Sequence, residues 1–397
     1  MKVNRQAKLR AALTIGFTLL VIIASTRLRA DSGSCGGTTL VLPFTDVAGT
    51  PFFCEIAEAF FSELTNGTTP TTYTPRQNVS REQMAAFITR TMDQALKRGS
   101  RHAALKQFWT PASADGIGLT TVGSAPQLVE SDGTDLWVAN YGSNTVSRVR
   151  ASDGKLLDTW TGAGSAVGVL PAKGLIFITG NTFDTGGSLY LIDPTQPAGS
   201  VITLTSALGT FTRGIAFDGA RVWTANAGGS VSIVTLNPLS ISTVTAGFTQ
   251  PIGILYDGAN MWVTDQAAGK LFKLGANGAI IQTVNVGTTP QFPVFDGTNI
   301  WVPNTDSHTV TVVRASTGAI IATLTGNGLG DSTTAAFDGE RILVTNSSGH
   351  SVSLWKAADL SPLGSPSIGS NAPQIGACSD GLNFWVTLLN TGQLARF

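Results

Sequence analysis

Charged side chains are scarce in this chain of 397 residues, since Lys, Arg, Asp and Glu together make up 13%, about half the usual share. Long solvent-exposed helices are rich in such residues, so an all-helical fold is excluded. Glycine is abundant at 45 residues, and hydrophobic residues make up 42%. This composition excludes collagen-like repetition and charge-driven disorder, and it predicts a mainly β globular protein of short strands and tight turns.

Acidic residues are missing from the first 30 positions, which hold the basic residues Lys2, Arg5, Lys8, Arg10, Arg27 and Arg29. The whole chain balances 25 basic against 25 acidic residues; without these six, 19 basic face 25 acidic, a net charge of −6. Because phosphate binding needs a basic surface, a nucleic-acid partner is not expected.

An export signal accounts for the same segment, with basic residues followed by the apolar stretch Ala11 to Ser25 and a cleavage site after Ala30. We therefore predict a signal peptide over residues 1–30 and an exported protein of the cell envelope or extracellular space. The alternative is a retained anchor, although 15 helical residues rise only roughly 22 Å against a bilayer core of roughly 30 Å. No later segment is long and apolar enough to span a membrane.

Cysteine is rare as well, with three residues in all. Cys35 and Cys54 lie close together in an exported chain, and we predict a disulfide between them that stabilises the fold by roughly 3 kcal/mol. Cys378 lies far from both in an apolar strand, where it is expected to be a small buried hydrophobic residue.

Two helices are predicted in residues 31–96. The first carries apolar residues at helical spacing and stops at Asn66-Gly67; they are Phe53, Ile56, Ala57, Phe60 and Leu64. The second begins with a capping box of Ser80 and Gln83, and one face carries Met84, Phe87, Ile88, Thr91 and Ala95. Two helices of this length make a thin core, which the predicted disulfide would support.

This small region resembles one S-layer homology module. The resemblance rests on FTDV at Phe44 to Val47, YTP at Tyr73 to Pro75 and VSREQMAAFITR at Val79 to Arg90. Such modules commonly attach exported proteins to cell-wall polymers through a Thr-Arg-Ala-Glu-like motif. The residues matching that motif are Ser80, Arg81, Glu82 and Gln83.

The resemblance implies that Arg81 pairs with an anionic sugar substituent, since a guanidinium matches the geometry of a carboxylate. This chain departs from the family in having Gln83 for the final Glu and one copy where three often occur together. The alternative is that Ser80 only caps a helix and that Arg81 is solvated. Residues 97–114 are predicted to be a basic linker, which either is solvated or attracts anionic lipid.

From residue 115 to 397 the chain repeats a motif of about 40 residues. The register glycines are Gly133, Gly174, Gly219, Gly258, Gly297, Gly339 and Gly381. Five copies place a Trp four residues after the glycine, at Trp137, Trp223, Trp262, Trp301 and Trp385, where we expect it to pack in the core. The period and the seven copies predict a seven-bladed β-propeller.

Four strands fit into each period. In the fifth copy they are expected at residues 291–295, 299–304, 308–315 and 319–326. The last copy lacks a fourth strand, and residues 116–122 match the missing pattern. We therefore predict that this N-terminal strand closes the ring, which removes exposed sheet edges.

The strings WVAN, WVTD and LVTN resemble YVTN and NHL-like propeller families, including the virginiamycin B lyase-like group. That resemblance implies a metal and a catalytic His with glutamate neighbours. The repeated region holds two glutamates, Glu130 and Glu340, and two histidines, His308 and His350. The histidines fall on adjacent blades, too far apart to share one zinc ion, so we expect surface histidines and no metal or cofactor.

Binding is therefore favoured over catalysis, and the predicted ligand site is the mouth of the central channel. Counting back from the register glycines places there Gln127, Arg213, Ile252, Gln291 and Thr333, with Gln374 nearby. Alternatively, the glutamines satisfy loop backbone groups. The prediction is an exported envelope protein whose S-layer homology-like module binds an envelope component and tethers a ligand- or protein-binding propeller. The alternative is a propeller lyase or hydrolase resembling virginiamycin B lyase.

Overall fold

The computed structural model describes residues 30–35, 38–61, 64–98, 118–182, 186–348, 351–368 and 372–397. The predicted signal peptide, apart from Ala30, and nearly all of the predicted linker lie outside these ranges. The chain divides into two compact units, Met1–Thr110 and Pro111–Phe397, which are described separately below. Among the described residues, no helix is both long and apolar enough to cross a membrane.

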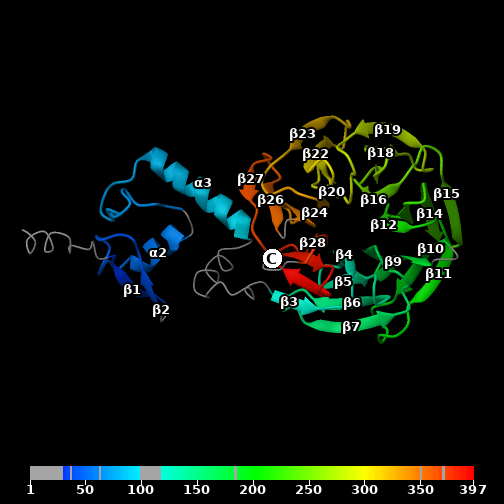
Figure 1. Ribbon diagram of the computed structural model, residues 1–397, viewed down its shortest axis with the longest axis horizontal. Coiled ribbons are helices and arrows are strands. Elements are labelled where there is room, and N and C mark those ends of the chain that lie inside the picture. Colours follow the sequence, from blue (N-terminus) through cyan, green and yellow to red (C-terminus); the bar gives the residue numbers. More distant parts are fainter. Residues whose placement is uncertain are drawn as a thin grey trace, which may run out of the picture. The chain divides into compact units, whose positions relative to one another are not determined.

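The first unit consists of a short antiparallel hairpin and two helices (Figure 1). The elements are β1 (Ser32–Cys35), β2 (Thr38–Val41), α2 (Phe53–Phe61) and α3 (Arg81–Arg98). The core gathers Cys35, Leu42, Phe44, Val47, Phe53, Ile56 and Ala57, so three of the five residues predicted on the inner face of the first helix are buried. Phe60 is partly buried, and Leu64 lies beyond the end of α2 at Phe61.

The predicted disulfide is confirmed, because Cys35 in β1 is bonded to Cys54 in α2. It ties the hairpin to the helix that covers the core of this small unit. Disulfides persist in oxidising compartments, so the bond points to a location outside the cytoplasm.

The second helix differs from its prediction. Along α3 the expected inward face is open, with Met84 49% and Ile88 61% exposed. A hydrogen bond from the Arg90 guanidinium to the main-chain carbonyl of Leu64, at 3.2 Å, links the helix to the chain that follows α2. The core of this unit is thus closed by the β1–β2 hairpin, which the sequence did not predict, in place of a second packed helix.

Seven four-stranded antiparallel sheets form the second unit and are arranged as blades around a central channel (Figure 1). Blade 1 comprises β4 (Pro126–Ser131), β5 (Asp135–Asn140), β6 (Thr145–Arg150) and β7 (Leu156–Thr161). Blade 2 comprises β8 (Val169–Ala172), β9 (Leu175–Thr182), β10 (Gly186–Ile192) and β11 (Ile202–Leu208). Blade 3 comprises β12 (Thr212–Phe217), β13 (Arg221–Asn226), β14 (Ser230–Leu236) and β15 (Leu239–Val244).

The later blades repeat this order from the channel outward. Blade 4 comprises β16 (Pro251–Tyr256), β17 (Met261–Asp265), β18 (Lys270–Leu274) and β19 (Ile280–Asn285). Blade 5 comprises β20 (Val294–Phe295), β21 (Asn299–Asn304), β22 (Thr309–Arg314) and β23 (Ile320–Leu324). Blade 6 comprises β24 (Ser332–Phe337), β25 (Arg341–Asn346), β26 (Val352–Lys356) and β27 (Pro362–Gly364). The second, third and fourth strands predicted for the fifth copy are confirmed to within two residues, whereas the first is shorter than predicted and spans Val294–Phe295.

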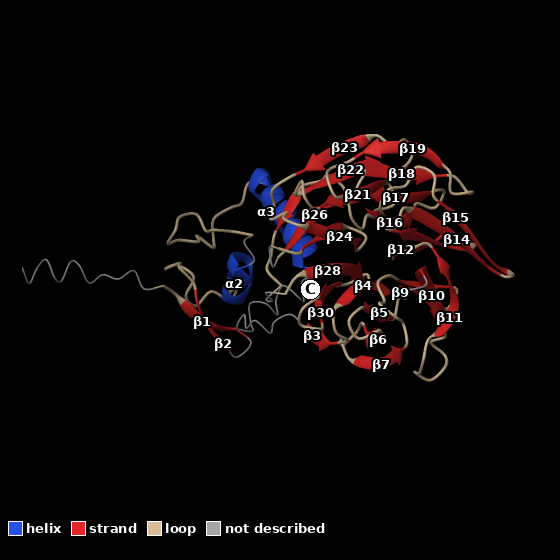
Figure 2. Ribbon diagram, turned by 45° about the vertical axis from the view of Figure 1, so that its right-hand side comes forward, coloured by secondary structure: helices blue, strands red, loops and turns tan. Residues whose placement is uncertain are grey.

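The last blade joins the two ends of the repeated region. It comprises β28 (Gln374–Ser379), β29 (Phe384–Leu388), β30 (Gln393–Arg396) and, as its outer strand, β3 (Gly118–Thr121). Strand β3 pairs antiparallel with β30, from Gly118 opposite Arg396 to Thr121 opposite Gln393 (Figure 2). The mainly β fold, the seven blades and the closure by the N-terminal strand are therefore confirmed.

Five of the Asp-Gly turns are joined to the register tryptophan of their copy by a side-chain hydrogen bond. The indole Nε1 of Trp301 donates to Asp296 Oδ2 at 2.7 Å, and the other four register tryptophans make the same bond at 2.7 to 2.8 Å. In the sixth copy Leu343 replaces the Trp, and the guanidinium of Arg341 donates to Asp338 Oδ2 at 2.6 Å instead. All five tryptophans are buried, as expected for core residues.

Candidate functional site

Threonines on second strands hold the innermost strands in place around the channel. The hydroxyl of Thr387 in blade 7 donates to the main-chain carbonyl of Gln127 in blade 1 at 2.6 Å. Equivalent bonds run from Thr179 to the carbonyl of Arg213 and from Thr264 to that of Gln291, each at 2.7 Å. These bonds cross from blade to blade, so they fix the ring of innermost strands that surrounds the channel.

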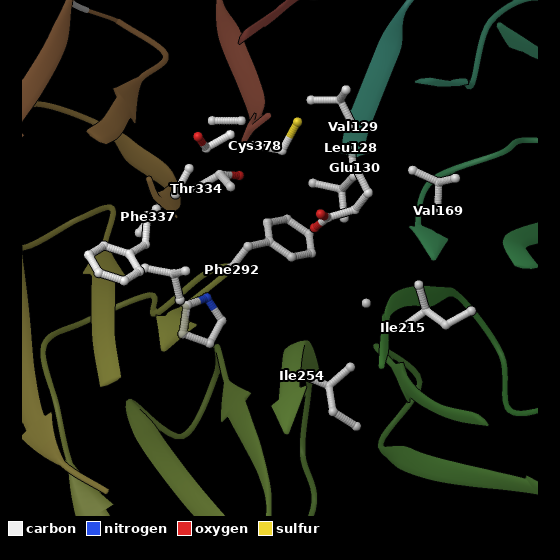
Figure 3. A pocket seen from close by; sticks show the side chains of 17 residues that line it. Leu128, Val129, Glu130, Val169, Ile215, Ile254, Phe292, Thr334, Phe337 and Cys378 are labelled. Atoms are coloured by element: carbon white, nitrogen blue, oxygen red, sulfur yellow. The ribbon is translucent and has the colours of Figure 1, made fainter. Parts of the chain in front are cut away.

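A cavity of about 190 Å³ lies where the innermost strands meet, and all seven blades contribute to its lining. Apolar side chains contribute to its walls, with Val169, Ile215 and Ile254 on one side (Figure 3). The two hydroxyl side chains of the lining are already engaged. Thr334 donates to the carbonyl of Ile375, and Ser379 donates to the carbonyl of Asn383. The donor hydrogens of these two side chains are therefore committed to the main chain.

Glu130 is the one charged residue of this lining. Its side chain extends into the cavity, and the carboxyl group and the ring of Phe292 point toward one another (Figure 3). Among the residues that the structure describes, none donates a hydrogen bond to this carboxyl or forms an ion pair with it. The side chain reaches water in the channel but is surrounded by protein, and this loss of solvation raises the pKa of Glu130 to about 7.

Cys378, on β28, lines the same cavity and is buried, as the sequence predicts. Burial, with the charges of Glu130 and Asp380, raises the pKa of the Cys378 thiol well above its ordinary value. The thiol is therefore protonated at neutral pH, and an inert thiol fits its predicted role as a buried apolar residue.

The repeat pattern singles out Glu130, which is not among the residues predicted at the channel mouth. Glu130 stands three residues before its register glycine, where the other six copies have apolar residues: Pro171, Ala216, Leu255, Val294, Ala336 and Cys378. A glutamate at a position that is otherwise apolar is an exception within the repeat. This exception identifies a residue of the channel more directly than the polar character of the predicted glutamines does.

None of the six residues predicted at the channel mouth, Ile252 and Thr333 included, is in the lining of this cavity. Gln127, Arg213 and Gln291 are half-buried, and their carbonyls accept the threonine bonds between blades. Gln374 is fully buried at the start of β28, where its amide group pairs with the main chain of Ser351 at 2.8 and 3.1 Å. The structure thus places Gln374 among satisfied backbone groups, while ligand binding by the three half-buried residues stays a prediction.

His308 lies at the surface, as predicted. Its side chain is 56% exposed, and its Nδ1 lies 3.6 Å from Asp331 Oδ1. His350 lies outside the described residues. Within the described ranges, no three His, Cys, Asp or Glu side chains are grouped as they would be to hold a metal ion.

In the first unit, the predicted capping box is present at the start of α3. The backbone N–H of Gln83 donates to Ser80 Oγ at 3.2 Å, and the backbone N–H of Ser80 donates to Gln83 Oε1 at 2.9 Å. Arg81 and Glu82, which lie between them, are exposed. Ser80 and Gln83 are therefore used by the helix start, while the side chains of Arg81 and Glu82, which belong to the same predicted envelope-binding set, take no part in the cap.

The short motifs that carry the family resemblance contact one another in space. Asp46 of FTDV accepts the backbone N–H groups of Tyr73 and Thr74 at 2.8 and 2.7 Å. The ring of Phe44 packs on that of Tyr73, with centroids 5.3 Å apart. These contacts hold the loop between the helices against the core.

Comparison with known proteins supports the propeller and leaves the first unit unassigned. No family model matches the chain, and no curated protein matches its sequence. The WD40 β-propeller domain of Doa1 is similar in structure, with 15% identity, a TM-score of 0.58 and 71% of this chain and 97% of that chain covered.

Virginiamycin B lyase from Staphylococcus aureus is also similar, with 16% identity, a TM-score of 0.58 and coverage of 70% and 98%. A streptogramin B lyase matches with 14% identity, a TM-score of 0.57 and coverage of 70% and 97%. At such identities the likeness shows a shared propeller fold, which hosts many unrelated functions. The resemblance of the first unit to S-layer homology modules stays a hypothesis.

Proposed function

We propose that this is an exported, envelope-associated protein in which the first unit binds an envelope component and the propeller binds a ligand or protein without catalysing a reaction. The cavity at the centre of the propeller carries the binding part of this proposal. It is built by all seven blades and contains one carboxyl group, which has no partner among the described residues, whereas acid–base chemistry ordinarily needs several titratable groups that converge on one atom.

The tethering part rests on Arg81 and on the disulfide. Arg81 is exposed in the first turn of an 18-residue helix, where backbone N–H groups and the positive end of the helix dipole favour an anion. The Cys35–Cys54 bond supports export, since such bonds form in oxidising compartments. The partner is thus an anionic polymer of the cell wall or another acidic envelope component.

The test is cosedimentation of the mature protein with isolated cell envelopes. Arg81→Ala should reduce the bound fraction severalfold, and the matched control Arg76→Ala, an exposed arginine in the preceding loop, should leave it unchanged. An equal loss in both variants would indicate nonspecific charge attraction. Unchanged binding in Arg81→Ala would refute the assigned site.

A lyase or hydrolase on the same propeller is the second candidate function. The observation that favours it is the raised pKa of Glu130, about 7, which suits a general base at neutral pH. Incubation of the mature protein with virginiamycin B, followed by mass spectrometry, tests it. Turnover that disappears in Glu130→Gln would establish catalysis in place of binding.

A further inference from the structure

The position of Glu130 in the repeat has no structural explanation. In the other copies the equivalent side chain is apolar, and Ala216, Ala336 and Cys378 are buried there at 3 to 6% exposure. Glu130 reaches water in the channel, the protein around it reduces its solvation, and in the described part of the chain it gains no hydrogen bond or counter-ion in return. Its carboxyl group is therefore available to a partner from outside the chain.

The surroundings of Glu130 select the charge of that partner. A carboxylate attracts a cation, and the π-face of an aromatic ring such as Phe292 attracts one as well. Both side chains point into the cavity toward each other (Figure 3). An anion would be repelled by Glu130, and the hydroxyl donors of Thr334 and Ser379 are already engaged.

The same surroundings favour an organic cation over a metal ion. Calcium takes roughly six to eight oxygen ligands, and the lining offers one carboxylate among aliphatic and aromatic side chains. An apolar wall gains free energy from an apolar substituent on the ligand. With about 190 Å³, the cavity is smaller than the roughly 300 Å³ at which sites for drug-sized molecules begin, so that substituent is compact.

We propose that the central channel binds a primary ammonium group that carries one compact apolar substituent. The ammonium group donates to the Glu130 carboxylate beside Phe292, and the substituent packs against Val169, Ile215 and Ile254. This inference rests on the proposed binding function of the propeller and names the class of its ligand. A free amine and the N-terminus of a peptide share this chemistry.

Binding should depend on pH through Glu130. The strands packed against β4 are β5, β8, β28 and β29. Strand β5 contributes Asp135, which is paired with Arg148 at 2.6 Å, and β28 contributes the protonated thiol of Cys378, while β8 and β29 contain no titratable side chain.

Asp132, two residues after Glu130, is ionised throughout the range of interest. Burial opposes its ionisation, but hydrogen bonds from Trp137 and from the N–H groups of Asp135 and Thr134, with the charge of Arg148, outweigh burial and lower the pKa of Asp132. Glu130 is therefore the group that titrates near neutrality. A cation that binds its ionised form should bind about thirty-fold more weakly at pH 5.5 than at pH 8.

The experiment is calorimetric titration of the mature protein with 2-phenylethylammonium, 2-phenylethanol and phenylacetate at pH 8. The ammonium compound should bind at least tenfold more tightly than the neutral and anionic isosteres. Glu130→Gln should abolish that preference, and Glu340→Gln, which removes the other glutamate of the propeller, should retain it. A phenylalanyl peptide and its N-acetylated form, titrated in parallel, distinguish a peptide N-terminus from a free amine as the source.

Three results would overturn the inference. If the ammonium compound does not bind the unmodified protein, or binds Glu130→Gln equally well, the carboxylate is not its site. If 2-phenylethanol binds as tightly as the ammonium compound, the channel is a binding site as proposed, and the ammonium class alone is wrong. The envelope cosedimentation is independent of all three, so failure of the tether is recognised separately.

Discussion

Removal of strand β3 should destabilise the propeller by an amount that can be worked out from its contacts. Four residues of β3 pair with β30, the backbone N–H of Val122 donates to Gly392 at 2.9 Å, and the hydroxyl of the buried Thr120 donates to Gly154. Roughly five hydrogen bonds at about 1 kcal/mol each lower the free energy of unfolding by about 5 kcal/mol. For a domain of about 280 residues that lowers the melting temperature by roughly 8 to 10 °C.

Two shortened proteins isolate this effect. One begins at Lys106 and keeps β3, and the other begins at Ser124 and lacks it. Calorimetry or circular dichroism should show the lower melting temperature for the shorter protein alone, and a peptide of residues 116–123 should restore part of the difference. Equal melting temperatures would refute the reasoning, because β3 would then contribute nothing to closure.

Three further predictions concern single side chains. Trp301→Phe removes an indole hydrogen bond and should lower the free energy of unfolding, measured in urea, by about 1–2 kcal/mol more than Trp355→Phe does. Trp355 is the control because its Nε1 is buried without a partner in the described chain; equal losses would contradict this. The raised pKa of Glu130 means that its carboxyl favours the folded state while protonated, below about pH 4.5, and loses that contribution as the pH rises through about 7. Glu130→Gln should therefore raise stability at pH 8.5 by about 1–2 kcal/mol, after allowance for water in the channel, and should be neutral at pH 4; the opposite trend would contradict the burial of the group. Cys35→Ser should cost the first unit roughly 3 kcal/mol and speed hydrogen exchange in α2 while leaving the blades unchanged; unaltered exchange in α2 would contradict the role of the disulfide.

The propeller could be predicted because its determinants repeat along the sequence. Six of the seven copies carry an Asp-Gly turn, all have an apolar strand after it, and five have a Trp that bonds back to the Asp, so one pattern is read several times. The closing strand β3 could be predicted because the last copy ends after three strands and lacks a fourth. In the sixth copy, where Leu343 replaces the Trp, the guanidinium of Arg341 donates to the Asp of the turn instead.

The first unit was predicted less completely because its decisive contacts are not periodic. The spacing of Phe53, Ile56 and Ala57 predicts a buried helix face, and the structure buries it. The same spacing in α3 predicts a second buried face, yet Met84 and Ile88 are exposed. Helical periodicity shows that a face is apolar but does not say what covers it, and the hairpin that closes this core has no strong strand pattern.

The candidate site was missed for a physical reason as well. Polar character alone predicts Gln374 as a channel residue, but its amide group pairs with the main chain of Ser351. Glu130 is distinguished by its register position, which is apolar in every other copy. The comparison that finds it is between copies of the repeat, because a charge placed where burial is the rule needs a compensating partner.

The most direct test of the proposed division of labour is sedimentation of the two units with isolated cell envelopes. Residues 31–105 and residues 106–397 would be purified separately and compared with the mature protein. The account predicts that residues 31–105 sediment as the mature protein does, while the propeller stays in the supernatant. If residues 106–397 sediment with envelopes as well as the mature protein does, the propeller itself is the envelope binder and the tether is wrongly assigned.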